Sequence, residues 1–260
     1  MLRALFRGWR LIGTGISFCL FGAGGLVLGF IVFPVIRVMT ESNQRRMTWA
    51  REAIRLAFKL FIFVMNGLGV LRYSFRGRER LDRRGLLILA NHPSLIDAVF
   101  LMANVRNADC VVDAPLARNP FTRGGVRTAG YICNDVGGLP MVAACIASLE
   151  AGGNLVFFPE GMRTSPGGPI RLTRGGAHVA VRGSRDVTPV VIRCVPPTLT
   201  RGEKWWKVPP RQVHFTIEVH EDIAVRPFIE HCPEPALAAR ALPTHLQEYF
   251  TRESRAHAVA

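Results

Sequence analysis

Residues Leu86–Asp97 read Leu-Leu-Ile-Leu-Ala-Asn-His-Pro-Ser-Leu-Ile-Asp, a short apolar run followed directly by a polar turn. An apolar run of this length that ends at turn residues is typical of a buried strand, and we predict one over Leu86–Ala90. Pro93 and Ser94 suit the start of a helix, which we predict over Ser94–Val105. The segment therefore predicts a strand, a turn and a helix, the building unit of an α/β fold.

The same alternation of short apolar runs and helical stretches continues after Arg72. It favours an α/β domain with no internal repeat. The further strands are expected at Cys110–Asp113, Asn154–Phe158, Val187–Val195 and Val213–Val219, and the further helices at Leu139–Glu150, Arg174–Val181 and Pro235–Phe250, the last kinked or split at Pro243.

Composition indicates that part of this chain contacts lipid. The chain has 260 residues, of which 49% are hydrophobic and 20% charged, and its mean hydropathy is +0.20. This balance excludes an intrinsically disordered protein and is slightly too apolar for an ordinary soluble enzyme. We expect one domain, or at most two.

An uncharged segment near the N-terminus is the candidate for that contact. Leu11–Ile36 carries no charge, and as a helix it would measure about 39 Å against a hydrocarbon core of about 30 Å. A membrane-spanning helix is expected, although the glycines of the segment and Pro34 also allow a re-entrant hairpin. A cleaved signal peptide is less favoured, because the run is longer than a usual apolar signal region.

A second apolar stretch, Ala50–Leu71, carries Arg51, Arg55 and Lys59 at helical spacing. This pattern predicts a helix that lies in the membrane interface. The alternative is an amphipathic helix packed on the protein's own core. The larger excess of arginines around the uncharged segment lies on its C-terminal side, which predicts that the body of the protein faces the cytoplasm.

The net charge of +14 favours anionic partners. Phospholipid head groups, nucleic acid and acidic cofactors all fit this charge. A basic, membrane-tethered nucleic-acid-binding protein is disfavoured, because the arginines are dispersed and no aromatic-basic recognition motif occurs. Six scattered cysteines without metal-ligand spacing indicate reduced thiols in a cytosol-like compartment and predict no structural metal site.

His92 and Asp97 form the first candidate chemical pair. A carboxylate in the first turns of the predicted helix can hold one ring nitrogen of His92 as the N–H tautomer. The other nitrogen is then free to take a proton from a hydroxyl. The alternative is that His92 caps a helix and that Asp97 is an ordinary first-turn acid, favoured by the helix dipole.

A second polar turn, Pro159–Thr164, follows the predicted strand Asn154–Phe158. Arg163 has the bidentate fork that grips a phosphate or carboxylate, and Gly161 lets the backbone approach a ligand closely. Alone, this segment is a turn with surface charges. Because both polar turns follow predicted strands, where α/β sheets place their ligands, their coincidence favours a functional site.

Together these residues resemble the glycerolipid acyltransferase superfamily over residues 75 to 215. Its first motif, N-H-x4-D, is matched by Asn91, His92 and Asp97, and its third, F-P-E-G-x-R-S/T, by Phe158–Thr164. A basic-Gly-Ala stretch follows from Arg174, and an apolar strand with prolines matches the fourth motif over residues 187–197. The resemblance implies an α/β fold with a mixed sheet flanked by helices and an N-terminal helical membrane anchor.

The resemblance also implies an O-acyltransferase. His92, oriented by Asp97, would deprotonate an acceptor hydroxyl, which attacks the thioester of an acyl-CoA or an acyl-carrier protein without cofactor or metal. The implied acceptor is a lysophospholipid of the lysophosphatidic acid type. The catalytic residues are expected to be His92 and Asp97, and the substrate-binding residues Asn91, Ser94, Glu160, Gly161, Arg163, Thr164 and Arg174.

This chain departs from the second motif of the family. Phosphate-acceptor members usually carry an arginine at the end of a G-x-[IF]-F-[IV]-x-R stretch, where this chain has Val136. Valine offers a phosphate neither charge nor donors. The alternative is the same acyl transfer to a non-glycerophosphate lipid acceptor, as in aryl-polyene or other specialised lipid pathways. Arg118, Arg123 and Arg127 either supply the missing charge or belong to a solvated surface.

The chain as a whole is then expected to be a membrane enzyme. Trp205 and Trp206, beside Lys204 and Lys207, either dip into the headgroup region or form a docked loop. The expected location is the bacterial inner membrane, with catalysis on the cytoplasmic face. The partners are the membrane surface, a membrane lipid acceptor and the acyl donor, but no nucleic acid. The expected domains are membrane-anchoring helices over 1–72, a catalytic acyltransferase domain over 73–250 and a frayed tail over 251–260.

Overall fold

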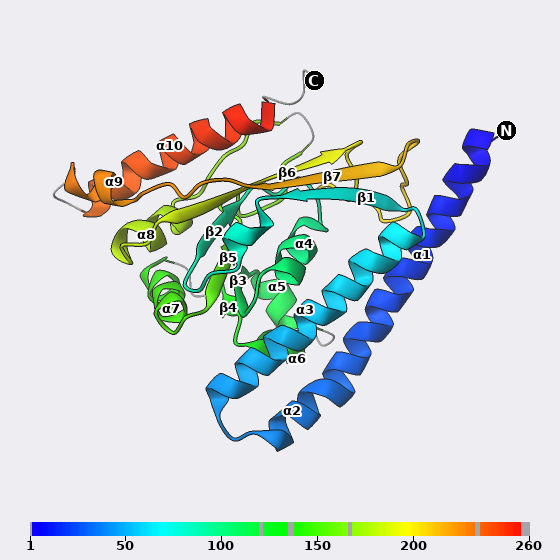
Figure 1. The fold of residues 1–260 in the computed structure, drawn as a ribbon, viewed down its shortest axis with the longest axis horizontal. Coiled ribbons are helices and arrows are strands. Elements are labelled where there is room, and N and C mark those ends of the chain that lie inside the picture. The colour runs from blue at the N-terminus through cyan, green and yellow to red at the C-terminus, as the bar shows by residue number, and fades with distance from the viewer. Residues whose placement is uncertain (1, 120–121, 135–137, 166–167, 232–234, 256–260) are drawn as a thin grey trace.

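A computed structural model describes residues 2–119, 122–134, 138–165, 168–231 and 235–255. It places a seven-stranded mixed sheet between two layers of helices, with a long helical hairpin along one side (Figure 1). The predicted α/β class with a mixed, helix-flanked sheet is confirmed. Val136, Cys232 and the last five residues of the predicted tail lie outside the described residues.

The sheet has the strand order β1-β7-β6-β2-β5-β3-β4. Neighbouring strands are parallel except β6 and β7, which are antiparallel. Five of the seven strands, β6, β2, β5, β3 and β4, therefore form one continuous parallel block. The strands are β1 (Leu71–Arg76), β2 (Leu87–Ala90), β3 (Ala108–Val112), β4 (Ile132–Cys133), β5 (Asn154–Phe157), β6 (Val187–Val195) and β7 (Val213–Val219).

Strand β2 divides its apolar side chains between two cores. Leu87 and Leu89 pack in a cluster with residues of α7 (Gly138–Glu150), α8 (Gly175–Arg182) and α10 (Pro235–Arg255). Ile88 and Ala90 pack in a second cluster, with residues of α3 (Asn43–Gly67) and α4 (Asp97–Asn104). Successive side chains of a strand point to opposite faces, so a strand covered on both faces is a continuous apolar run.

The five predicted strands and four predicted helices are all present: β6 and β7 have the predicted bounds, and the other elements have shifted ends. Two strands were not predicted: β1 carries polar residues on its exposed positions, and β4 has only two residues. The short helices α5 (Ala114–Arg118), α6 (Arg123–Ala129) and α9 (Arg226–Glu230), and a 3₁₀ turn at Arg78–Leu81, were also not predicted.

Helix α10 differs most from its prediction. It continues through Pro243 as one helix and ends at Arg255, so the first half of the predicted tail is helical. Leu242, Leu246 and Phe250 recur every four residues and are completely or almost completely buried. This buried stripe holds the helix on the sheet on both sides of the proline.

The uncharged N-terminal segment forms one continuous helical rod. It consists of α1 (Leu2–Val27), a π-helical turn (Leu28–Val32) and α2 (Phe33–Met39). The π turn precedes Pro34, where a proline ring and its missing N–H disturb regular α-helical bonding. Within the described residues, Leu5–Met39 is the one helix long and apolar enough to cross a membrane, and 11% of its most apolar window is buried.

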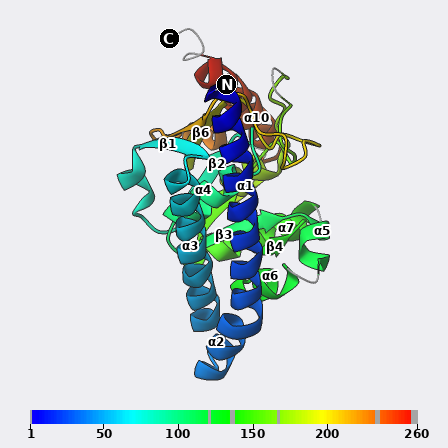
Figure 2. The ribbon, with the colours of Figure 1, turned by 90° about the vertical axis from the view of Figure 1, so that its right-hand side faces the viewer.

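Helix α3 runs back alongside this rod and completes a helical hairpin whose lower end projects past the sheet (Figure 2). One face of α3 packs on the core through Ile54, Phe61, Ile62 and Met65. The core-packing alternative for this helix is therefore correct for that face, whereas Phe63 on another face is 73% exposed.

Arg51 corrects the interpretation of the basic stripe on α3. Its side chain is 3% exposed and forms a 2.7 Å ion pair with Asp109 of β3. Its other nitrogens donate to the carbonyl of Ala129 and to Oδ1 of Asn107, and Ser148 donates to Asp109. Arg51 thus joins the hairpin to the sheet rather than facing a membrane interface.

Candidate active site

The site lies where two neighbouring parallel strands end. His92 follows β2, and Glu160 follows β5, the strand paired with β2. The backbone N–H of His92 donates to Oε1 of Glu160 at 2.8 Å, and the N–H of Thr164 donates to the carbonyl of His92 at 3.1 Å. The two polar turns, far apart in the sequence, are thus bonded to each other.

His92 and Asp97 form a close pair. Nδ1 of His92 lies 3.0 Å from Oδ2 of Asp97, the first residue of α4. The backbone N–H of Ser94 donates to the same oxygen at 2.5 Å. The Asp97 side chain is completely buried and that of His92 is 16% exposed. This arrangement holds the imidazole by one nitrogen and leaves the other, Nε2, available for proton transfer.

Burial dominates the electrostatics of Asp97. It raises the pKa of this carboxyl to about 6, against the opposing effects of His92, the Ser94 N–H and Arg163. Burial likewise raises the pKa of Glu160 to about 7. Near neutral pH Asp97 is mainly a carboxylate, the form that accepts the Nδ1–H of His92.

Phe158 completes the setting of the imidazole. Its ring stacks on that of His92 with 4.2 Å between centroids and 25° between planes. The stack and the Asp97 bond restrict the ring in two different directions. The sequence motif contained Phe158, but its contact with His92 was not predicted, because nothing in one sequence aligns residues 92 and 158.

Hydrogen bonds and one left-handed glycine shape the turn after β5 around Glu160. Gly161 has φ +72°, a left-handed conformation that favours glycine. Both the N–H and the hydroxyl of Thr173 donate to the carbonyl of Pro159, at 2.6 and 2.8 Å. Oε2 of Glu160 is buried and has no hydrogen-bond partner among the described atoms. The carboxyl group is therefore held by its other oxygen alone.

The guanidinium of Arg163 is hydrogen-bonded to protein backbone. Its Nη1 donates to the carbonyls of Leu199 and Thr200, at 2.8 and 3.2 Å. The N–H of Leu95 donates to the same Leu199 carbonyl at 3.2 Å. The segment after β6 is therefore a third wall of the site, which sequence patterns gave no signal for.

Other predicted binding residues lie less centrally. The Asn91 amide is engaged with β6, donating to the carbonyl of Ile192 and accepting from its N–H, at 2.8 and 2.7 Å. Ser94 contributes its backbone N–H to the pair. Arg174 is exposed at the N-terminal cap of α8. Arg118, Arg123 and Arg127, on α5 and α6, are exposed as well.

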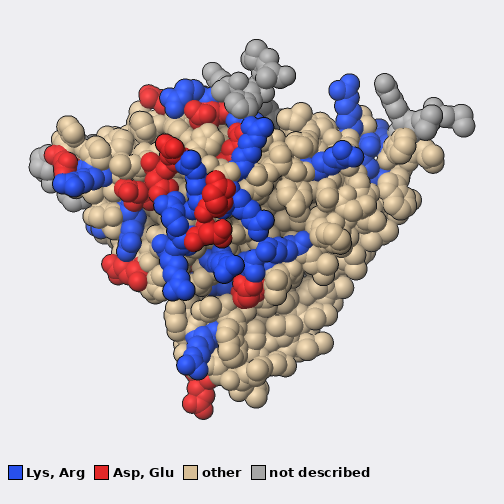
Figure 3. Space-filling model, viewed as in Figure 1, with Lys and Arg blue, Asp and Glu red and all other residues tan. Residues whose placement is uncertain are grey.

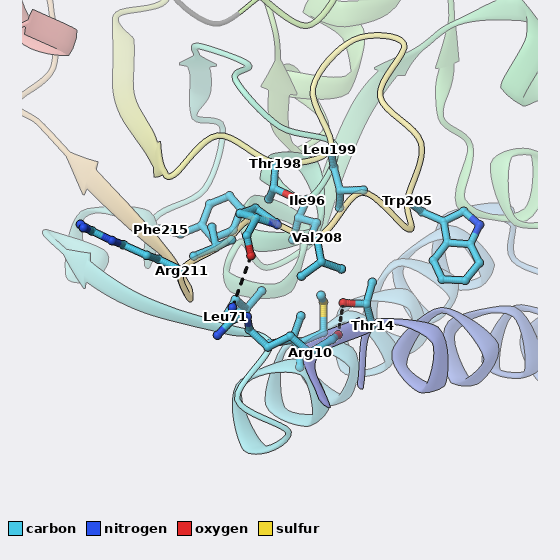
Figure 4. Close-up of a pocket in the computed structure, with 14 residues that line it drawn as sticks. Arg10, Thr14, Leu71, Ile96, Thr198, Leu199, Trp205, Val208, Arg211 and Phe215 are labelled. Carbon is cyan, nitrogen blue, oxygen red and sulfur yellow. Dashed lines mark hydrogen bonds between the residues drawn. The ribbon is translucent and has the colours of Figure 1, made fainter. Parts of the chain in front are cut away.

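A small apolar cavity adjoins the site through Ile96 and Leu199. Phe215, Val208 and Thr14 of α1 also line it, and Trp205 stands at its edge (Figure 4). The enclosed space is about 20 Å³, room for about one water molecule. The cavity in this conformation is therefore too small for a fatty chain.

Comparison with known proteins identifies the family. The model of the Acyltransferase family matches residues 72–193. A 1-acyl-sn-glycerol-3-phosphate acyltransferase of Pseudomonas aeruginosa is 26% identical over 216 residues, covering 80% of this chain and 78% of that protein. The crystal structure of the 1-acyl-sn-glycerophosphate (LPA) acyltransferase PlsC of Thermotoga maritima has the same fold, with a TM-score of 0.69 at 15% identity, over 97% of this chain and 96% of that one. With the paired motifs described above, these matches support an acyltransferase of the glycerolipid acyltransferase superfamily, whose acyltransferase domain is matched over residues 72–193.

Proposed function

We propose that this enzyme moves a fatty acyl group from acyl-CoA or acyl-carrier protein to the hydroxyl of a lysophospholipid of the lysophosphatidic acid type. The observation that carries the chemistry is the 3.0 Å contact between His92 Nδ1 and the buried carboxylate of Asp97. The name of the Pseudomonas aeruginosa relative supports the acceptor class.

In the proposed reaction His92 is the general base. Its Nε2 takes the proton of the acceptor hydroxyl while the oxygen attacks the thioester carbonyl. The tetrahedral intermediate collapses, the carbon–sulfur bond breaks, and the leaving sulfur receives the proton from His92. Asp97 keeps the imidazole in the required tautomer and stabilises its protonated form. No step requires a metal or a covalent acyl-enzyme.

A second candidate acceptor is a lipid alcohol without phosphate. It is favoured by the engagement of Arg163, whose Nη1 already binds two backbone carbonyls. The same chemistry at His92 serves both acceptors, because the thioester is activated in either case. The choice therefore depends on binding groups and not on the dyad.

The proposed setting is a bacterial inner membrane, with the catalytic domain on the cytoplasmic face. The apolar rod Leu5–Met39 supports membrane association. The proposed anchor, residues 1–72, ends inside β1, which belongs to the sheet of the catalytic domain. The anchor and the domain are thus continuous in structure.

The test is acyl transfer by the detergent-purified protein. Labelled acyl-CoA and acyl-carrier protein are offered with lysophosphatidic acid or with a panel of phosphate-free lipid alcohols. Transfer to lysophosphatidic acid that is lost in His92→Ala supports the first proposal, and transfer only to an alcohol supports the second. Full activity of purified His92→Ala would overturn the role of the dyad.

A further inference from the structure

A basic loop lies beside the N-terminal rod, outside the site described above. We call Thr200–Lys207 the basic loop; with Arg7 of α1 it lines an open groove of about 590 Å³. The groove is bordered by four cationic side chains, those of Arg7, Arg201, Lys204 and Lys207.

The charged side chains that line the groove are mostly positive. Among the described residues that line the groove, Glu203 is the single acid. That carboxylate is engaged within the loop, where it accepts from the N–H and hydroxyl of Thr200 at 3.1 and 3.2 Å and pairs with Lys207 at 3.3 Å. The groove therefore presents a net positive surface.

Contacts on two sides fix the basic loop in place. On the side of α1, the Trp205 ring lies 6.1 Å from that of Phe18, and just beyond the C-terminal end of the loop Arg10 donates to the carbonyl of Pro210 at 2.8 Å. On the other side, Arg163 of the active site donates to the carbonyl of Thr200. Figure 4 shows Trp205 and Leu199 on the same side of the cavity as the segment after β6 that carries them, with Thr14 and Arg10 on the opposite side. The loop thus connects the apolar rod with the catalytic turn.

The position of the loop matches a membrane boundary. Trp205 and Trp206 are 44% and 52% exposed, and the ammonium of Lys204 lies 5.1 Å from the centre of a Trp206 ring. Figure 3 shows basic side chains near the N-terminal end of the rod, above a broad uncharged surface at lower right, over α1 and α3. Exposed indoles next to cations, at the end of an apolar surface, are typical of the headgroup region of a bilayer.

We propose that this groove binds the phosphate headgroup of an anionic phospholipid of the bilayer that holds α1. The bound headgroup would fix the depth of the catalytic turn relative to the membrane surface, because Arg163 joins that turn to the basic loop. The inference rests on the membrane association proposed above, but on neither the acyl transfer nor its acceptor.

The test measures flotation of the full-length protein with phosphatidylcholine vesicles, with or without phosphatidylglycerol. The loop variant replaces Arg201, Lys204 and Lys207 by Gln. Its matched control replaces Arg84, Arg171 and Arg182, exposed arginines of the catalytic domain. We expect the preference for phosphatidylglycerol to fall about fivefold for each loop charge removed, about 100-fold in all, and to change little in the control.

A second measurement tests the position of the loop. Phosphatidylglycerol with brominated acyl chains is expected to quench the tryptophan fluorescence of the wild type more than that of Trp206→Phe. In the flotation test, the site is overturned if the loop variant prefers phosphatidylglycerol as strongly as the wild type does. It is also overturned if the control variant loses this preference to the same extent as the loop variant. Competition by inorganic phosphate at low concentration assigns it to free phosphate instead. A wild type that floats with neither vesicle overturns the membrane association itself, whereas acyl transfer in detergent is tested separately.

Discussion

Asp97 lies 3.0 Å from Nδ1 of His92 and has no exposed surface. A carboxylate in this position is costly, since burial raises its pKa to about 6. The fold keeps it at the start of α4 and supports it with the N–H of Ser94. The pair therefore lowers stability in exchange for a correctly held imidazole.

Replacement of His92 or Asp97 is expected to reduce the rate of acyl transfer with little effect on substrate binding. We expect His92→Ala to lower kcat by about 1,000-fold or more, and Asp97→Asn by about 100- to 10,000-fold, because the imidazole loses its proton-accepting tautomer. His214→Ala is the control, since His214 is on β7 and contacts Ser74. Steady-state rates with labelled acyl donor give the comparison, and a fully active Asp97→Asn would contradict it.

The buried carboxylate also makes stability depend on pH. The pKa of Asp97 is about 6 in the folded protein against an ordinary value of 3.8. As pH rises, the unfolded chain therefore releases this proton before the folded protein does. The Asp97 carboxyl consequently lowers the free energy of unfolding as pH rises from about 4 to about 6. Asp97→Asn should therefore raise the free energy of unfolding at pH 8 by up to about 3 kcal/mol. This gain in the free energy of unfolding should disappear at pH 4. Denaturant titrations at both pH values measure it; a variant less stable than the wild type at pH 8 is the contrary result.

The buried ion pair of Arg51 should contribute far more to the free energy of unfolding than the more exposed ion pair of Arg55 on the same helix. Arg51→Met leaves Asp109 buried without its cation, and we expect a loss of about 3 to 5 kcal/mol. Arg55→Met removes the more exposed pair with Glu52 on the same helix, for about 1 kcal/mol or less. Thermal unfolding in one detergent compares the two variants, and equal losses would argue against a special role for Arg51.

Arg163 is expected to act on the shape of the site. Because its Nη1 holds the carbonyls of Leu199 and Thr200, Arg163→Lys should lower kcat/KM by about 10- to 100-fold for acceptors with and without a phosphate alike. The measurement compares the loss of kcat/KM for an acceptor with a phosphate with the loss for an acceptor without one. A loss confined to the phosphate-bearing acceptor would show instead that the guanidinium binds the phosphate.

Sequence patterns predicted the parts of the molecule whose signals are local. The predicted strand over Leu86–Ala90 is an apolar run, the strand over Val213–Val219 alternates apolar and polar residues, and the turn residues between elements mark their ends. The prediction that both polar turns contribute to a functional site followed from strand ends alone, because α/β sheets place their ligands there; the hydrogen bonds between the two turns were not predicted. What the sequence could not show were contacts between distant residues: Phe158 on His92, and Arg163 on the segment after β6.

Arg51 illustrates why a helical stripe can mislead. Its spacing with Arg55 and Lys59 is that of one face, yet Asp109, Asn107 and Ala129 of other segments draw it into the interior. Similarly, Pro243 predicted a helix that is kinked or split, but α10 is not split, because buried side chains on both sides of the proline stabilise one helix. In both cases tertiary contacts outweighed a correct local signal.

Strand β1 follows the helical hairpin directly, yet the strand with which it pairs is β7, near the other end of the chain. During synthesis the hairpin leaves the ribosome long before residues 213–219 exist, so β1 must wait for its partner. Arg51 can already join the hairpin to Asp109 of β3 at that stage, but β1 itself can enter the sheet only when translation is almost complete. A chain that stops before Val213 would keep the hairpin and its contact with β3 but leave β1 without its partner strand, which makes late truncation a greater danger to assembly than its distance from His92 suggests.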